Sequence, residues 1–247
     1  MRTKLLGVPM DVGTFEDTVK TIQHYISTRS LHNAVIVANV HLLTEAQKNP
    51  LLMQAFETSS LAVTDGMPLV WLAKKEIPQA ERIVGVDLMH ALCKTGARIF
   101  LLGGVEGVAE ALGKKLSQQY PNIVIAGTAC PPFRTLSEKE EVKIIANINQ
   151  AQPDILFVAL GAPKQELWIH KHKTALNVPV LIGVGAAFDY AMDRLSRAPR
   201  WMQACGMEWF YRFLQEPRRL FKRYAISNAH FIWLVLKQYL GLPRSAK

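Results

Sequence analysis

Residues 154–166 of this chain read DILFVALGAPKQE, an apolar run that stops at a turn of small residues and continues as a polar segment. The uninterrupted apolar residues 155–159 are typical of a strand that is covered on both faces of a parallel sheet. Gly161 permits a tight turn, and Pro163 suits the first position of a helix. The stretch therefore predicts a buried strand that leads through a loop into a helix.

The start of that helix is a candidate anion-binding site. Free backbone N–H groups at a helix N-terminus favour a negatively charged ligand, and Lys164 and Gln165 are placed to contact it. A purely structural turn with solvated polar residues is the alternative for this segment taken alone. α/β folds bind ligands at such turns. Similar turns after other strands of this chain therefore favour a binding site over a purely structural turn.

Strand-like and helix-like segments alternate along the first 196 residues. Helices are expected where helical periodicity follows a capping residue, as at Thr14 and Ser137. Six such strand–turn–helix units predict an α/β fold with a mostly parallel, Rossmann-like sheet and helices on both faces. The expected strands are residues 34–38, 61–63, 98–102, 123–126, 155–159 and 178–184.

The loops after these strands should meet at one edge of the sheet, because parallel strands end together. This edge is the expected active site. Its residues are Asn39, His41, Asp65, Gly66, Gly103, Gly104, Gly161 to Gln165, and 183–189 with Gly185.

Asp65 is the candidate general base, since it follows a strand and precedes Gly66 at this edge. Its alternative role is to cap the helix expected from Met67. Asn39 likewise has two interpretations, a substrate contact or an ordinary residue of a strand-end turn.

The Gly103-Gly104 turn indicates contact with a phosphate or nucleotide. It lacks GxGxxG spacing, and the next strand ends at Gly127-Thr128 without the acid that would hold the ribose of NAD. Nicotinamide binding is therefore disfavoured. No cofactor and no metal site are expected: His170 and His172 are two residues apart, which places them on different faces of a helix, as solvated surface residues.

The basic residues are concentrated at the C-terminal end. The formal net charge is +9, and residues 197–247 carry ten Lys or Arg residues against Glu208 and Glu216, a net charge of +8. We therefore divide the chain into an α/β core, residues 1–196, and a basic appendage, residues 197–247. Such asymmetry points to an anionic partner: a membrane surface, a nucleic acid or a phosphorylated substrate.

Aromatic residues alternate with these basic residues, which fits an interfacial amphipathic element lying on anionic lipid. The alternative is that the aromatic residues pack on the core. Pro217 should interrupt the helix. Arg212, Arg218 and Arg219 are candidates to bind a diphosphate, because guanidinium groups hold phosphate oxygens bidentately. The apolar residues that interleave with the basic ones are Trp201, Met202, Met207, Trp209, Phe210, Phe213, Leu214 and Phe221, and residues 231–236 add apolar surface.

No stretch of about 18 apolar residues suggests a membrane-spanning helix, and residues 1–7 are too short for the apolar region of a signal peptide. The three cysteines form no CxxC motif, so reduced thiols are expected. We expect a cytoplasmic protein. The oligomeric state stays open, a homo-oligomer included.

On these residues the chain resembles the WecG/TagA/CpsF family of bacterial glycosyltransferases along nearly its whole length. Several motifs in the same order make the resemblance specific. They are Gly7–Pro9, Ala38-Asn39, Thr64–Gly66, Arg82–Leu88, Phe100–Gly104, Val158–Glu166, Gly183–Gly185, Phe188-Asp189, Arg197–Pro199, Glu208-Trp209, Tyr211-Arg212 and Glu216-Pro217.

The resemblance implies transfer of an N-acetylhexosamine, or its uronic acid, from a UDP-sugar to a polyprenyl-diphosphate-linked sugar, with inversion and without a metal. It implies an appendage that reaches the inner face of the cell membrane and helps to complete the active site. Asp65 would be the base, and Asn39, Arg82 and Gln165 substrate contacts. The remaining candidate contacts are Gly103, Gly104, Gly161, Lys164, Gly185, Arg212, Arg218 and Arg219.

Two other functions stay open on the sequence. A nucleotide-dependent oxidoreductase would carry a bound nicotinamide. A basic nucleic-acid-binding module would bind DNA in preference to anionic liposomes. No RNA-binding signature accompanies the aromatic residues, so we expect no nucleic-acid partner.

Overall fold

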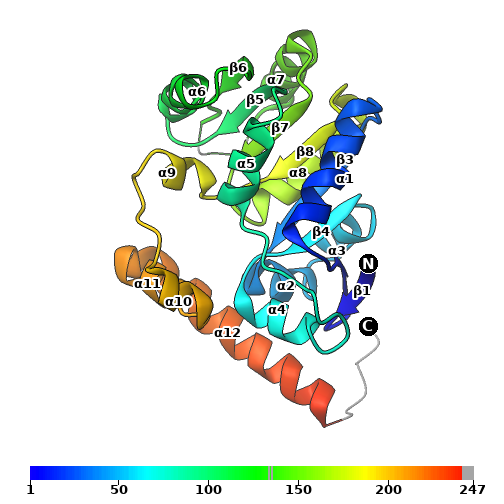
Figure 1. The fold of residues 1–247 in the computed structure, drawn as a ribbon, viewed down its shortest axis with the longest axis vertical. Helices are drawn as coiled ribbons and strands as arrows, with labels where there is room; N and C mark the ends of the chain where they lie inside the picture. Colours follow the sequence, from blue (N-terminus) through cyan, green and yellow to red (C-terminus); the bar gives the residue numbers. More distant parts are fainter. Residues whose placement is uncertain (133, 135, 241–247) are drawn as a thin grey trace.

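The computed structural model describes residues 1–132, 134 and 136–240. At its centre lies a six-stranded sheet with the order β4-β3-β8-β7-β5-β6, and every neighbouring pair of strands is parallel (Figure 1). Each strand coincides with a predicted one, which confirms the α/β fold. The strands are β3 (Asn33–Ala38), β4 (Leu61–Thr64), β5 (Arg98–Gly103), β6 (Val124–Ala129), β7 (Ile155–Ala159) and β8 (Val180–Gly183).

Strand β7 shows why the apolar run forms a central strand. Ile155 and Phe157 pack into the core on one face of the sheet, and Leu156 and Val158 pack into the core on the other. Successive side chains of a strand point to opposite faces, so only an uninterrupted apolar run can bury both.

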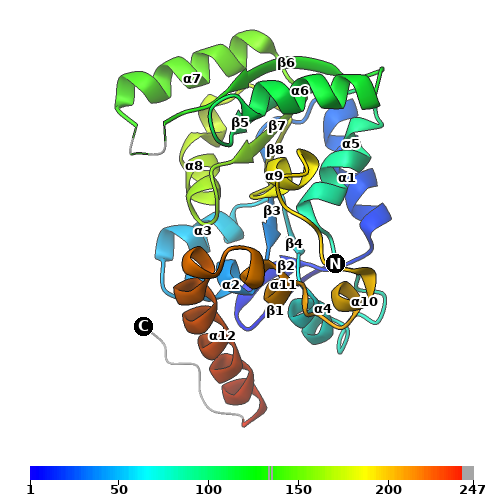
Figure 2. The ribbon, with the colours of Figure 1, turned by 90° about the vertical axis from the view of Figure 1, so that its left-hand side faces the viewer.

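Helices cover both faces, as predicted. Figure 2 shows α1 and α5 on one side of the strands and α3 and α8 on the other. One layer is α1 (Phe15–Ser27), α5 (Gly85–Cys93), α6 (Val108–Gln119) and α9 (Ala187–Ala191). The other is α2 (Val40–Ala46), α3 (Pro50–Glu57), α4 (Met67–Ala73), α7 (Glu138–Ala151) and α8 (Lys164–His172), which leads into the short 3-10 helix η1 (Lys173–Ala175).

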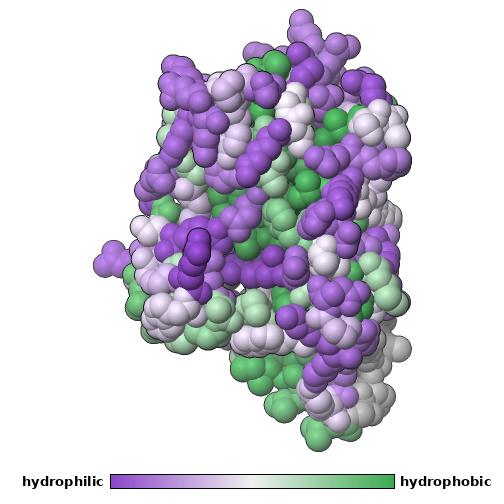
Figure 3. Space-filling model, viewed as in Figure 1, coloured by the Kyte–Doolittle hydropathy of each residue, from purple (hydrophilic) through white to green (hydrophobic). Residues whose placement is uncertain are grey.

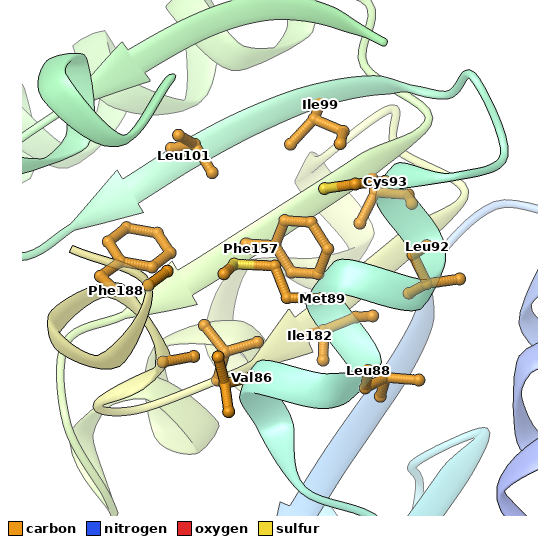
Figure 4. Close-up of a cluster of buried hydrophobic side chains, with 14 of the residues drawn as sticks. Val86, Leu88, Met89, Leu92, Cys93, Ile99, Leu101, Phe157, Ile182 and Phe188 are labelled. Atoms are coloured by element: carbon orange, nitrogen blue, oxygen red, sulfur yellow. The ribbon is translucent and has the colours of Figure 1, made fainter. Parts of the chain in front are cut away.

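Figure 4 shows how the first layer is fixed to the sheet. Phe157 of β7 and Ile182 of β8 lie against Leu88 and Met89 of α5, with Phe188 of α9 beside them. All five side chains are at most 1% exposed. This packing holds the start of α5 and the loop after β8 at the carboxyl edge of the sheet.

Local sequence signals were right at some helix ends and missed others. Thr14 and Ser137 cap α1 and α7, as predicted. Pro163 lies one residue before α8, not inside its first turn. The sequence reading also omitted α3, α5 and an antiparallel hairpin of β1 (Arg2–Leu5) and β2 (Val8–Asp11). That hairpin turns at Leu6-Gly7, both with positive φ, and Leu6 is not the Asn or Asp that normally signals such a turn.

Between the core and residue 240 the chain forms α10 (Arg200–Ala204), α11 (Glu208–Gln215) and α12 (Pro217–Tyr239), here called the C-terminal helices. Pro217 is the first residue of α12, so the predicted interruption is confirmed. Residues 241–247 of the predicted appendage lie outside the described residues. Within the part of the chain that the structure describes, no helix is long and apolar enough to cross a membrane.

Helix α12 lies along α2 of the core (Figures 1 and 2). Nδ1 of His41 and the hydroxyl of the buried Ser227 are 2.8 Å apart, and Phe231 and Val235 pack against the apolar core around α2. Trp201, Leu214 and Phe221 remain at least 60% exposed. Part of the apolar surface of the C-terminal helices therefore packs on the core, which was the alternative to a lipid-facing surface. A large part remains exposed.

Candidate active site

A cleft of about 1850 Å³ opens where the carboxyl edge of the sheet faces the C-terminal helices. Figure 3 shows hydrophilic side chains gathered at this boundary. The cleft contains most of the residues expected to converge. Those lining it are Asn39, His41, Asp65, Gly66, Arg82, Gly104, Gly161 to Gln165, Gly183, Gly185, Asp189, Arg212 and Arg219.

Asp65 follows β4 directly, and its backbone N–H donates to the carbonyl of Ala38 at 2.7 Å, which continues the parallel pairing with β3. Its Oδ1 lies 3.3 Å from Nε of Arg82. Helix α4 begins after Gly66 and has no side-chain cap, so the capping role considered for Asp65 is wrong.

Burial raises the pKa of Asp65, and the neighbouring Arg82 only partly offsets this effect. A carboxylate with a raised pKa takes up a proton more readily than an ordinary surface aspartate. The proton affinity of the Asp65 carboxylate is therefore set mainly by its burial, and Asp65 remains the candidate base.

Arg82 joins the core to the C-terminal helices. Its Nε contacts Asp65, and its Nη2 forms an ion pair with Oε2 of Glu208 at the start of α11. Glu208 also lies 3.9 Å from Nε of Arg197, whose Nη1 donates to Asp87 of α5 at 2.6 Å. This network of alternating charges fixes α11 beside the candidate base.

Gln165 and Glu166, in the first turn of α8, form a second network. The backbone N–H of Gly185 donates to Oε1 of Gln165 at 3.0 Å, and Nε2 of Gln165 donates to Oε1 of Glu166 at 2.7 Å. A Cβ at Gly183 would lie 2.8 Å from Nε2 of Gln165, so glycine leaves the space for these side chains. The amide of Gln165 is thereby oriented at the wall of the cleft.

Glu166 is 2% exposed, and its Oε2 has no hydrogen-bond partner. Burial raises the pKa of this carboxyl to about 7, although the bond from Gln165 opposes the shift. Glu166 was not among the predicted site residues, because nothing in the local pattern of residues 164–172 shows that this position of α8 is buried.

Arginines of the C-terminal helices form the opposite wall. Nη1 of Arg212 donates to the hydroxyl of Tyr190 at 2.7 Å, and Glu216 binds both Arg212 and Arg219. Arg223, one turn after Arg219, also lines the cleft. The site thus places several cations opposite the carboxyl edge of the sheet, an arrangement suited to phosphate groups.

Two candidate contacts lie outside the lining. Arg218 is exposed and is offset by one residue from the face that carries Arg219 and Arg223. Gly103 sits in the sheet, where a Cβ would lie 2.5 Å from the carbonyl oxygen of Ala159, so its small size serves strand packing.

Asn39 and His172 make contacts that stabilise the fold. Oδ1 of Asn39 accepts from the backbone N–H of Leu42 and caps α2, although Asn39 also lines the cleft. His172 is 7% exposed, with its ring centroid 5.0 Å from that of Trp168 and its Nε2 3.4 Å from Glu141. The expectation of a solvated His172 is therefore wrong, because α7 approaches α8 there.

Four residues of the site were not among the predicted ones, because their place in the site depends on how distant segments pack together. These residues are Glu166, Tyr190, Glu208 and Arg223. The i, i+4 spacing of Arg219 and Arg223 was the one signal that could have shown a common face. Across residues 1–132, 134 and 136–240, no group of three or more His, Cys, Asp or Glu side chains could hold a metal ion.

Comparison with known proteins gives two findings. The profile of the glycosyl transferase WecG/TagA/CpsF family matches residues 3–245. An N-acetylglucosaminyldiphosphoundecaprenol N-acetyl-beta-D-mannosaminyltransferase of Staphylococcus aureus strain MW2 is 30% identical over 225 residues, which are 89% of this chain and 87% of the relative. The protein of the same name from strain NCTC 8325 / PS 47 matches with the same identity and coverage.

Proposed function

This chain belongs to the WecG/TagA/CpsF family of glycosyl transferases, and from that premise we propose that it transfers an N-acetylhexosamine, or its uronic acid, from a UDP-sugar to a polyprenyl-diphosphate-linked sugar. The names of the Staphylococcus relatives support this acceptor, since they specify N-acetylglucosaminyldiphosphoundecaprenol. Family membership sets aside the oxidoreductase and the nucleic-acid-binding module.

The observation that carries the proposal is the position of Asp65 across one cleft from Arg212, Arg219 and Arg223. Glycosyl transfer needs a base for the incoming hydroxyl and positive charge for the departing diphosphate. The cleft offers both on opposing walls.

The proposed reaction is a single displacement. Asp65 accepts the proton of the acceptor hydroxyl while that oxygen attacks the anomeric carbon. The bond from this carbon to the UDP oxygen breaks, and UDP leaves with the electron pair. Attack opposite the leaving group inverts the anomeric configuration.

The leaving diphosphate carries negative charge that must be stabilised as it develops. We assign this role to Arg212 and Arg219, and the glycines at Gly104, Gly161 and Gly185 would let the substrate phosphates approach the backbone closely. Gln165 and Lys164 would contact the donor from the same wall. Because guanidinium groups supply the positive charge, the proposed reaction needs no divalent metal.

We place the enzyme at the inner face of the cell membrane, with the C-terminal helices toward the lipid. The basic residues of 197–247 would attract anionic lipid, and exposed residues of α12 such as Trp233 and Leu236 would enter the interface.

The test is a transfer assay with a panel of UDP-sugars and N-acetylglucosaminyl-diphosphoprenol as acceptor, run with and without excess chelator. We expect one UDP-N-acetylhexosamine, or its uronic acid, to be used, with inverted product anomer and activity retained in chelator. Absence of transfer from every UDP-sugar would contradict the proposed reaction. Activity that is lost in chelator and restored by Mg²⁺ or Mn²⁺ would contradict metal independence.

A further inference from the structure

The active-site cleft extends beyond the charged residues into a groove between α4 and α12. One wall is formed by Met67, Trp71 and Leu72 of the core, and the other by Phe231, Ile232, Val235 and Tyr239 of α12. Together with Asn228 and Lys75, these residues line the same cavity as Asp65. We call this part the α4–α12 groove.

The chemistry of α12 changes along its length. Its first turns carry Arg219 and Arg223, whereas its later residues in the groove are uncharged. Lys75 is the charged side chain at the far end, and its Nζ lies 4.0 Å from the centre of the Tyr239 ring. The cavity is therefore cationic at its inner end, uncharged along the α12 wall from Asn228 to Tyr239, and bordered by Lys75 at its far end.

The apolar walls remain open at the surface. Trp71 is 49% exposed, Ile232 57% and Tyr239 64%. Figure 3 shows an apolar surface over the end of the molecule where α12 terminates. From Arg223 to Tyr239 the helix rises about 24 Å, at 1.5 Å per residue.

We propose that the α4–α12 groove binds the first part of the acceptor's polyprenyl chain, with the attached diphosphate at the arginines and the rest of the chain in the lipid. The inference rests on the proposed function, because it is the acceptor that supplies an anionic head joined to a hydrocarbon chain. Binding in the groove would remove apolar surface of the polyprenyl chain from water together with apolar surface of Trp71 and Ile232. This burial favours binding.

The test compares the affinities of geranyl diphosphate and of the twice-longer geranylgeranyl diphosphate for the full chain, by titration calorimetry below their micelle concentrations. The groove variant is Ile232→Ser/Tyr239→Ser. The matched control is Trp233→Ser/Leu236→Ser, which changes two equally exposed apolar residues of α12 that lie outside the groove.

We expect the wild type to bind the longer compound about tenfold or more tightly, because additional methylene groups leave water. The groove variant should lose most of this gain, and the control variant should keep it. Equal affinities of the wild type for both compounds, or equal losses in the two variants, would overturn the inference.

If the groove instead bound another copy of this chain, the experiment would give a different result. In that case the groove variant would shift the oligomeric state and chain length would have no effect on binding, which would also overturn the inference. Because prenyl diphosphates bind without sugar transfer, a failed transfer assay would count against the proposed function alone.

Discussion

Asp65 of the core and Glu208 of α11 bind the same guanidinium group, that of Arg82. The candidate base is therefore connected to the C-terminal helices through one side chain. The charge of Glu208 also contributes to raising the pKa of Asp65, after the larger effect of burial. Changes in α11 should consequently alter the chemistry at Asp65.

We predict that Glu208→Gln moves the acid limb of the kcat/KM profile to lower pH. Removing this negative charge lowers the pKa of Asp65, so the base stays ionised at more acidic pH. The measurement is kcat/KM from pH 4 to 8. Glu216→Gln removes a charge that binds Arg212 and Arg219 instead, and its acid limb should stay in place. An unmoved limb in Glu208→Gln would refute the coupling.

Glu166→Gln should change the pH dependence of stability. Because the folded pKa is raised to about 7, the native state holds this proton more tightly than the unfolded chain does. The wild type should therefore lose stability relative to the variant as the pH rises from about 4.5 to 7, by up to about 3 kcal/mol. Urea unfolding of both proteins at pH 5 and pH 8 measures this. A difference that is equal at both pH values would show that Glu166 is not buried as described.

Arg219→Ala should weaken UDP-sugar or acceptor binding by about 10- to 100-fold, the range expected for lost charge-assisted hydrogen bonds. Arg218→Ala is the matched control, because it removes the same charge from the neighbouring position outside the cleft. We expect less than a threefold effect from the control at moderate salt. Equal effects of the two changes on KM would indicate that only the overall charge matters.

Trp233→Ser/Leu236→Ser should lower the partition of the full chain onto anionic liposomes without unfolding it. Both side chains are about half exposed, so their loss removes surface available to lipid. Cosedimentation at low and high salt measures the partition, and binding by the wild type should weaken with salt. Unchanged partition of the variant would place the lipid-facing surface elsewhere.

The fold was predictable because its signals are local. In β7, alternate residues enter opposite cores, and only an apolar run such as Ile155 to Ala159 satisfies both. Thr14 and Ser137 indicate where their helices begin, because their side chains cap the helix N-termini. The hairpin at Leu6-Gly7 has no such signal, because the buried Leu6 has a positive φ that leucine does not normally favour.

The site was predictable in position but only partly in its interactions. Parallel strands end together, so the convergence of Asn39, Asp65 and Gln165 follows from topology. The pairing of Arg82 with Glu208 joins residues far apart in sequence and depends on how α11 meets the core. The burial of His172 likewise depends on α7, which no spacing within α8 reveals.

Single-turnover sugar transfer by Asp65→Asn at saturating acceptor tests whether Asp65 removes the proton from the acceptor hydroxyl. We expect a rate lower than that of the wild type by about 10²-fold or more, with UDP-sugar affinity retained, because the amide keeps the size of the side chain but cannot accept the proton. Near-normal turnover of Asp65→Asn under these conditions would contradict this role of Asp65.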